Sequence, residues 1–207
     1  MVSISPGLVS ALSIGIRGKD FVIVGSSKRE LYGSLIISEK GSLIRVFDNR
    51  VITCFSGHVP DIQYIFREIE WFLRTEQLKR DRELSIVEIA RFIGLLLFSY
   101  KLFPNIAFGI VGGIEVDNKT KLFDLDPLGS VLEDNYVASG ISAEVAYGLL
   151  EKEYKPDITF DEGKELVIRT LKSVAKRDVL IGRYADVAYV RIVDNKREGG
   201  VDVIKLL

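Results

Sequence analysis

The spacing of the apolar residues changes repeatedly along the chain, and the order of these changes constrains the fold more than any other feature. Residues 12–16 read LSIGI and alternate large apolar with small side chains, as in a half-buried strand. After the turn residues at 18–20, residues 21–24 read FVIV without interruption, which is typical of a strand buried on both faces. The chain is therefore predicted to begin with an antiparallel strand pair.

Helical spacing then replaces strand spacing in two separate places. Ser85 and Glu88, and likewise Thr159 and Glu162, have the spacing of a capping box at a helix start. Ser142 is the expected N-cap of a further helix. The four helices are expected at residues 59–79, 85–100, 142–154 and 161–178.

Apolar strand-like runs stand before, between and after the two helix pairs. They are expected at residues 34–38, 43–47, 51–56, 106–116, 121–126, 130–139, 186–193 and 201–207, with a turn at 194–200. Antiparallel hairpins combined with helices in pairs predict an α+β fold. In this fold two packed antiparallel sheets lie between two helix pairs, as a four-layer αββα sandwich.

Composition excludes several classes of protein. The 28 Lys and Arg residues balance 29 Asp and Glu residues, so the chain carries no electrostatic signature for nucleic acid or for an anionic membrane. The longest apolar run, residues 92–98, is far shorter than the ~20 residues that cross a bilayer. Cys54 is the only cysteine, so neither a disulfide nor a cysteine-rich metal site can form within the chain. These features predict a soluble, cytoplasmic protein.

The first ten residues and the polar side chains offer few candidates for chemistry. Residues 1–10 lack the basic and apolar regions of a secretory signal, and a leader of this kind is expected to be disordered. His58 is the only histidine, so a structural or surface role is expected and no metal or cofactor site. Gly112 and Gly113 lie in a strand, where glycines mark a bulge or close backbone approach. Asp124 and Asp126 can form a carboxylate couple or lie solvated near a turn, and the second interpretation is favoured.

Four segments of the chain carry a family resemblance. SIGIRGKDFVIVGSS, LFSYKLFPNIAFGIVGGIE, LFDLDPLGSVLEDNYVASG and EVAYGLLEKEY resemble β-type subunits of the 20S proteasome, especially archaeal ones. The resemblance covers nearly the whole chain after Ser10. It implies the N-terminal nucleophile hydrolase architecture, which is the sandwich predicted above, and the missing long N-terminal helix of α-type subunits places the chain on the β side.

In active members of this family the first strand begins at a threonine that self-cleavage of a leader exposes. Its hydroxyl is the nucleophile, with an aspartate and a lysine nearby. Alignment on Gly15 places Ala11 at the nucleophile position, Ser27 at the aspartate and Leu43 at the lysine. A methyl group cannot attack a carbonyl. The resemblance therefore implies a naturally silent subunit.

Supporting positions of the family site are only partly retained. Ile141 and Ile181 stand where the family has serines, whereas Asp178 matches its aspartate and Gly57 its oxyanion-hole glycine. No catalytic residue is therefore expected to be active.

Two serines near the leader junction keep an alternative open. An active threonine- or serine-type endopeptidase subunit could use Ser10 or Ser13, although neither would find the missing lysine. If the chain is silent, the leader, residues 1–10, is kept or is trimmed only by a neighbouring subunit. The domain proper is expected at 11–194. The C-terminal extension, 195–207, either clasps a neighbour or adds a strand to its own sheet.

The resemblance also implies partners. The chain is expected in stacked heptameric rings with proteasome α subunits and a second, active β subunit, where it contributes wall and interface to ATP-dependent degradation of unfolded proteins. Neither a nucleic acid nor a membrane partner is expected. The alternative from another class of function is a self-standing binding module, which would behave as a monomer.

Overall fold

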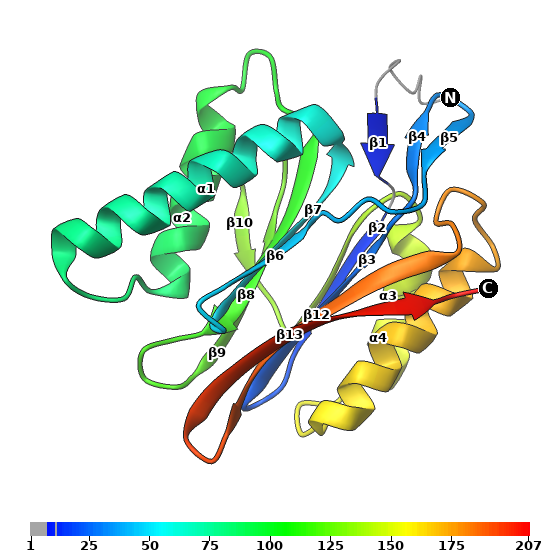
Figure 1. The fold of residues 1–207 in the computed structure, drawn as a ribbon. Coiled ribbons are helices and arrows are strands. Elements are labelled where there is room, and N and C mark those ends of the chain that lie inside the picture. The colour runs from blue at the N-terminus through cyan, green and yellow to red at the C-terminus, as the bar shows by residue number, and fades with distance from the viewer. Residues whose placement is uncertain (1–7, 11) are drawn as a thin grey trace.

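Two antiparallel sheets lie face to face, and a pair of helices covers the outer face of each sheet (Figure 1). The structure is a computed structural model that describes residues 8–10 and 12–207. The expectations for Ala11 and for residues 1–7 concern positions outside these described residues. The layered α+β sandwich predicted from the sequence, with the N-terminal nucleophile hydrolase architecture, is confirmed.

The larger sheet runs in the order β10-β9-β8-β7-β1-β4-β5, and β6 pairs with β7 beside this path. Its strands are β1 (Leu8–Ser10), β4 (Glu30–Tyr32), β5 (Leu35–Ser38), β6 (Ile44–Phe47), β7 (Val51–His58), β8 (Ala107–Ile114), β9 (Thr120–Leu125) and β10 (Val131–Glu133). The smaller sheet has the order β11-β2-β3-β12-β13. Its strands are β2 (Leu12–Arg17), β3 (Phe21–Ser27), β11 (Tyr136–Gly140), β12 (Tyr184–Val193) and β13 (Lys196–Lys205).

The helices pack as two pairs on opposite sides of the sheets. They are α1 (Val59–Arg80), α2 (Ile86–Ser99), α3 (Ala143–Glu153) and α4 (Phe160–Ala175). The first pair shares an apolar cluster with the larger sheet, the second pair shares one with the smaller sheet, and a third cluster fills the space between the sheets. Within the described residues, no helix is both long and apolar enough to span a membrane.

The capping signals of the sequence identified the correct N-cap residue at three helix starts, but at the third the side chain forms no capping hydrogen bond. Ser85 with Glu88, and Thr159 with Glu162, form complete capping boxes at α2 and α4. Ser142 precedes α3 but has a left-handed backbone, φ 61°, and its side chain caps nothing. Its hydroxyl is used elsewhere, as described below.

The predicted strand at 130–139 is two strands that belong to different sheets. The N–H of Asp134 donates to the carbonyl of Leu122 in the larger sheet at 3.1 Å. One residue later, the carbonyl of Asn135 accepts from the N–H of Arg17 in the smaller sheet at 2.9 Å. The chain therefore crosses from one sheet to the other between β10 and β11, which no local periodicity reveals.

The prediction of a long turn at 194–200 is also wrong. The turn consists of Asp194 and Asn195, whose φ angles of 49° and 61° suit a tight two-residue hairpin. Gly199 lies within β13, where an added Cβ would approach the Cα of Asn49 to 3.0 Å. Because β13 pairs with β12 along its whole length, the C-terminal extension adds a strand to its own sheet.

The structure differs most from the sequence-based prediction in the leader, residues 1–10, of which residues 8–10 are described. Leu8 to Ser10 form β1, which pairs with β4 on one side and, at Val9 and Ser10, with β7 on the other. The expectation of a disordered leader is therefore wrong for these three residues, because two strand edges are available to satisfy their backbone groups.

Gly113 shows close backbone approach, which is one of the two alternatives expected for a glycine in this strand. A Cβ there would lie 2.3 Å from the carbonyl oxygen of Arg50.

We predict that Gly113→Ala lowers the free energy of unfolding by about 1–3 kcal/mol, because β7 and β8 must separate. Gly148, in exposed α3 backbone with open space around it, is the control. Gly148→Ala should raise stability by up to about 1 kcal/mol. Urea unfolding measures both, and equal effects would contradict the packing argument.

Candidate functional site

The expected site lies where β2 begins, between the two sheets. Leu12 pairs with Gly140 of β11, and its backbone N–H donates to the hydroxyl of Ser27 at 3.2 Å. Just before the junction, Ser10 pairs with Gly57 of β7 and with Glu30 of β4. Ala11 itself lies outside the described residues, but the chain on both sides of it is held by positions that the sequence assigned to the site.

The two positions expected to replace charged residues are buried. Ser27 is 2% exposed, and its hydroxyl oxygen accepts the Leu12 N–H. Leu43 is 4% exposed and packs in the apolar cluster beneath α1 and α2, while its carbonyl accepts from the N–H of Phe55. Neither side chain can carry charge, so these two positions supply neither a proton acceptor nor a cation.

Gly57 and the lone histidine form a corner at the end of β7. Gly57 has a φ of 127°, and a Cβ would stand 2.2 Å from the carbonyl oxygen of Ile106. The N–H of His58 donates to that same carbonyl at 2.7 Å. The carboxylate of Asp61 lies 3.2 Å from His58 Nδ1 and accepts from the N–H of Ile106. His58 therefore has partners that fit a structural role, one of the two roles expected for it.

Asp178 has a hydroxyl partner that the sequence analysis missed. The Ser142 hydroxyl donates to Asp178 Oδ2, and the N–H of Leu180 donates to Oδ1 at 2.8 Å. Ile141 and Ile181, at the expected serine positions, instead pack in the apolar cluster beneath α3 and α4. The left-handed backbone of Ser142 aims its hydroxyl at Asp178, and the only sequence signal was a serine next to Ile141.

A buried polar group beside the site was also missed. Lys28 Nζ lies 2.7 Å from Asp186 Oδ1, and the two side chains are only 12% and 3% exposed. Nearby, the thiol of Cys54 donates to the hydroxyl of Ser13 at 3.1 Å. Burial raises the pKa of the Cys54 thiol to about 12, so the sulfur stays protonated and unreactive near neutral pH. Ser13, one of the alternative nucleophiles, is 0% exposed.

Asp124 and Asp126 bind different partners. Asp124 accepts from the Ser139 hydroxyl at 2.7 Å, and burial raises the pKa of its carboxyl. Asp126 accepts from the hydroxyl of Ser130 and from the N–H of Leu128, and so orders the loop before β10. These bonds account for both carboxylates without a shared reacting group. Across residues 8–10 and 12–207, His, Cys, Asp and Glu side chains form no group of three or more suited to a metal ion.

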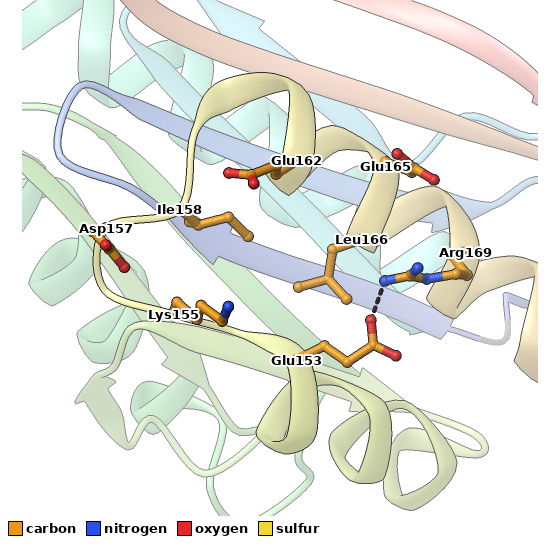
Figure 2. Close-up of a pocket in the computed structure, with 8 residues that line it drawn as sticks. All are labelled: Glu153, Lys155, Asp157, Ile158, Glu162, Glu165, Leu166 and Arg169. Carbon is orange, nitrogen blue, oxygen red and sulfur yellow. Dashed lines mark hydrogen bonds and ion pairs between the residues drawn. The ribbon is translucent and has the colours of Figure 1, made fainter.

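A surface hollow lies elsewhere, between the end of α3 and the start of α4 (Figure 2). Glu153 of α3 and Arg169 of α4 form an ion pair across it, and Glu162 and Glu165 line the same hollow. It includes none of the expected site positions. All of these charged groups lie on the solvated surface of the helices, so the hollow does not indicate a chemical function.

The sequence profile of a family described as "Proteasome subunit" matches residues 10–190. The chain belongs to the proteasome β-subunit family. "Proteasome subunit beta 1" of Hyperthermus butylicus is 33% identical over 181 residues, which are 87% of this chain and 89% of the relative. "Proteasome subunit beta 2" of Pyrobaculum aerophilum is 34% identical over 182 residues, 88% of this chain and 89% of the relative. "Proteasome subunit beta 1" of Ignicoccus hospitalis is 34% identical over 180 residues, 87% and 90% of the two chains.

The Lys28–Asp186 ion pair is expected to stabilise the fold of this proteasome β subunit, and this can be tested by substitution. We predict that Asp186→Ala lowers the free energy of unfolding by about 3–5 kcal/mol, because the Lys28 ammonium is left buried and unpaired. The control is Asp117→Ala, which removes the partner of the exposed Lys119 and should cost at most about 1 kcal/mol. Urea unfolding of the two variants, with the parent chain as reference, measures the difference. A loss for Asp186→Ala no larger than for Asp117→Ala would contradict a structural role for the pair.

Proposed function

We propose that the chain is a structural, catalytically silent β subunit of the 20S proteasome core. The observation that carries this proposal is that positions 27 and 43, where the family resemblance places an aspartate and a lysine, hold a buried serine and a buried leucine. A hydroxyl nucleophile needs a proton acceptor and a suitable electrostatic environment to attack a peptide bond. Residue 11 is alanine in the sequence, so the nucleophile itself is missing as well.

The alternative nucleophiles find little support. The Ser13 side chain is buried between the sheets, where its oxygen accepts from Cys54, and a peptide substrate has no access to it. Ser10 has its backbone paired to Glu30 and to Gly57, so its segment is a strand of the larger sheet. The retained residues Asp178 and Gly57 then maintain the shape of the site: Asp178 ties the loop after α4 to Ser142, and Gly57 permits the β7 corner.

The leader supports the same proposal. Without β1, the edges of β4 and β7 would face each other across a gap about one strand wide, which is a slot that an extended peptide fits by strand addition. The chain's own residues 8–10 fill that slot. We therefore propose that the leader, residues 1–10, is kept in the mature subunit, ahead of a domain at 11–194. Residues 195–207 complete the smaller sheet.

Proteasome β subunits assemble with α subunits in stacked rings. Within such rings we propose that this chain is a heteromeric member, placed beside a second, active β subunit that cleaves unfolded proteins entering the chamber. The relatives named above are numbered beta 1 and beta 2, in keeping with more than one kind of β subunit. We assign the complex to the cytoplasm of an archaeon, because of the resemblance and the single buried thiol.

Reconstitution with and without a second β subunit tests this function. Particles built from this chain and α subunits are predicted to show no peptidase activity, and adding the second β subunit of the same organism should produce it. Intact mass should show the leader still attached to this chain, and a covalent warhead should label only the second β subunit. Peptidase activity from this chain and α subunits alone, or a warhead attached to this chain, would overturn the proposal.

Removal of the leader tests its part in the sheet. Deleting residues 1–10 should speed amide hydrogen exchange in the β4–β5 hairpin by about tenfold or more, since β4 loses its hydrogen-bonded neighbour β1. Exchange in the β12–β13 hairpin, which has no contact with β1 in the strand order, should stay unchanged and serves as the control. A peptide with the sequence of residues 5–10, added in excess, should restore the protection. Unchanged exchange at residues 30–38 after the deletion would rule out this role.

A further inference from the structure

Two groups of exposed apolar side chains lie at opposite ends of the larger sheet. The hairpin patch consists of Tyr32, Leu35, Ile36 and Ile37 on and beside strands β4 and β5, with exposed fractions between 47% and 62%. The edge patch consists of Leu95 and Phe98 on α2 and of Leu128 and Leu132 beside and within β10, with exposed fractions between 48% and 68%. Strands β5 and β10 are the first and last of the strand order.

The edge patch is one continuous surface because α2 lies directly on the chain entering β10. A Cβ at Gly94 would stand 2.5 Å from Val131 Cγ2, and one at Gly129 would stand 2.8 Å from the Cβ of Phe98. The contact is therefore too close for a side chain at either glycine position. The outward-facing Leu95 and Phe98 of α2 therefore adjoin the leucines that flank this contact.

The hairpin patch has apolar residues on both faces of its strand. Leu35, Ile36 and Ile37 are consecutive, so successive side chains point to opposite faces of β5, yet all three are more than two-fifths exposed. A strand at the edge of a sheet normally carries charge or proline that prevents pairing with other chains, and these three positions carry neither. The hairpin projects from the body of the molecule beside β1 (Figure 1).

We propose that the hairpin patch of this subunit packs on the edge patch of the next β-type subunit in the ring. Contact between two unlike patches is heterologous, and repetition of such a contact at opposite ends of a molecule generates a ring. A patch that paired with its own kind would close a dimer instead. The inference rests on the proposed function, to which it adds the surfaces and the neighbour, a second β-type chain that presents apolar side chains.

The size of the patches suits this role. Four large side chains, each about half exposed, form an apolar area on the order of a few hundred Å², which is the size of the largest apolar patch on a typical monomeric protein, and patches of this size are often functional. A specific interface buries about 800 Å² on each partner, with an apolar centre inside a polar rim. The apolar side chains supply the centre. Ser34 and Lys40 beside the hairpin, and Arg91 and Glu133 beside the edge patch, are exposed and supply the rim.

A photo-crosslinker tests which surface meets the hairpin. p-Benzoylphenylalanine at position 36 is introduced into the chain within particles that also contain α subunits and the second β subunit. Mass spectrometry should locate the crosslink on the adjacent β-type chain, at the residues that align with 91–98 or 128–133 of this sequence. Crosslinks confined to α subunits or to the facing β ring would overturn the inference.

Charge substitutions separate this inference from ring membership. Ile36→Glu and Leu95→Glu should each reduce incorporation into particles by about tenfold or more, without lowering the melting temperature of the isolated chain. Val203→Glu is the matched control, since Val203 is 63% exposed on β13 of the other sheet and lies in neither patch. Variants that enter particles as well as the control would refute the interface while ring membership stands. Absence of the parent chain from particles would refute both.

Discussion

The close packing of the two sheets is the constraint on which the rest of the molecule depends. Val22 and Val24 of the smaller sheet meet Ile52 and Ile110 of the larger one in an apolar cluster between the layers. Glycine permits this closeness, because a Cβ at Gly112 would approach Val22 to 2.8 Å. Each sheet therefore has one face fixed by the other, and its outer face must be covered by helices.

The candidate site lies where this apolar cluster ends. Toward the start of β2, valine and isoleucine give way to Ser13, Cys54 and the Lys28–Asp186 pair, which all have partners, and of these only the Lys28 side chain is partly exposed, at 12%. In the proposed silent subunit these polar groups serve the scaffold: they satisfy one another, hold the strand ends in register and leave no free nucleophile among themselves. A buried charge is tolerated there only because its counter-ion is within hydrogen-bond distance.

The leader links this site to the outer surface of the molecule. Strand β1 joins β7, which belongs to the interior of the larger sheet, to β4, whose hairpin carries the apolar patch at the end of that sheet. The same three residues thus occupy the slot beside the site and hold the hairpin in place. Under the proposed function, keeping the leader and presenting a ring contact are two results of one set of backbone hydrogen bonds.

The sequence by itself determined whatever depends on residue identity or on near neighbours. The capping boxes at Ser85 and Thr159 and the first hairpin were predictable, because their partners lie within a few residues. The uncharged residue types at positions 27 and 43 were equally plain, since no fold can give leucine a charge. Only the tertiary structure decided the strand position of Leu8–Ser10, the split between β10 and β11, and the pairing of Ser142 with Asp178 and of Lys28 with Asp186. Those partners are 36 and 158 residues apart for the two side-chain pairs, and periodicity carries no information about which distant backbone edge or charge a segment will meet.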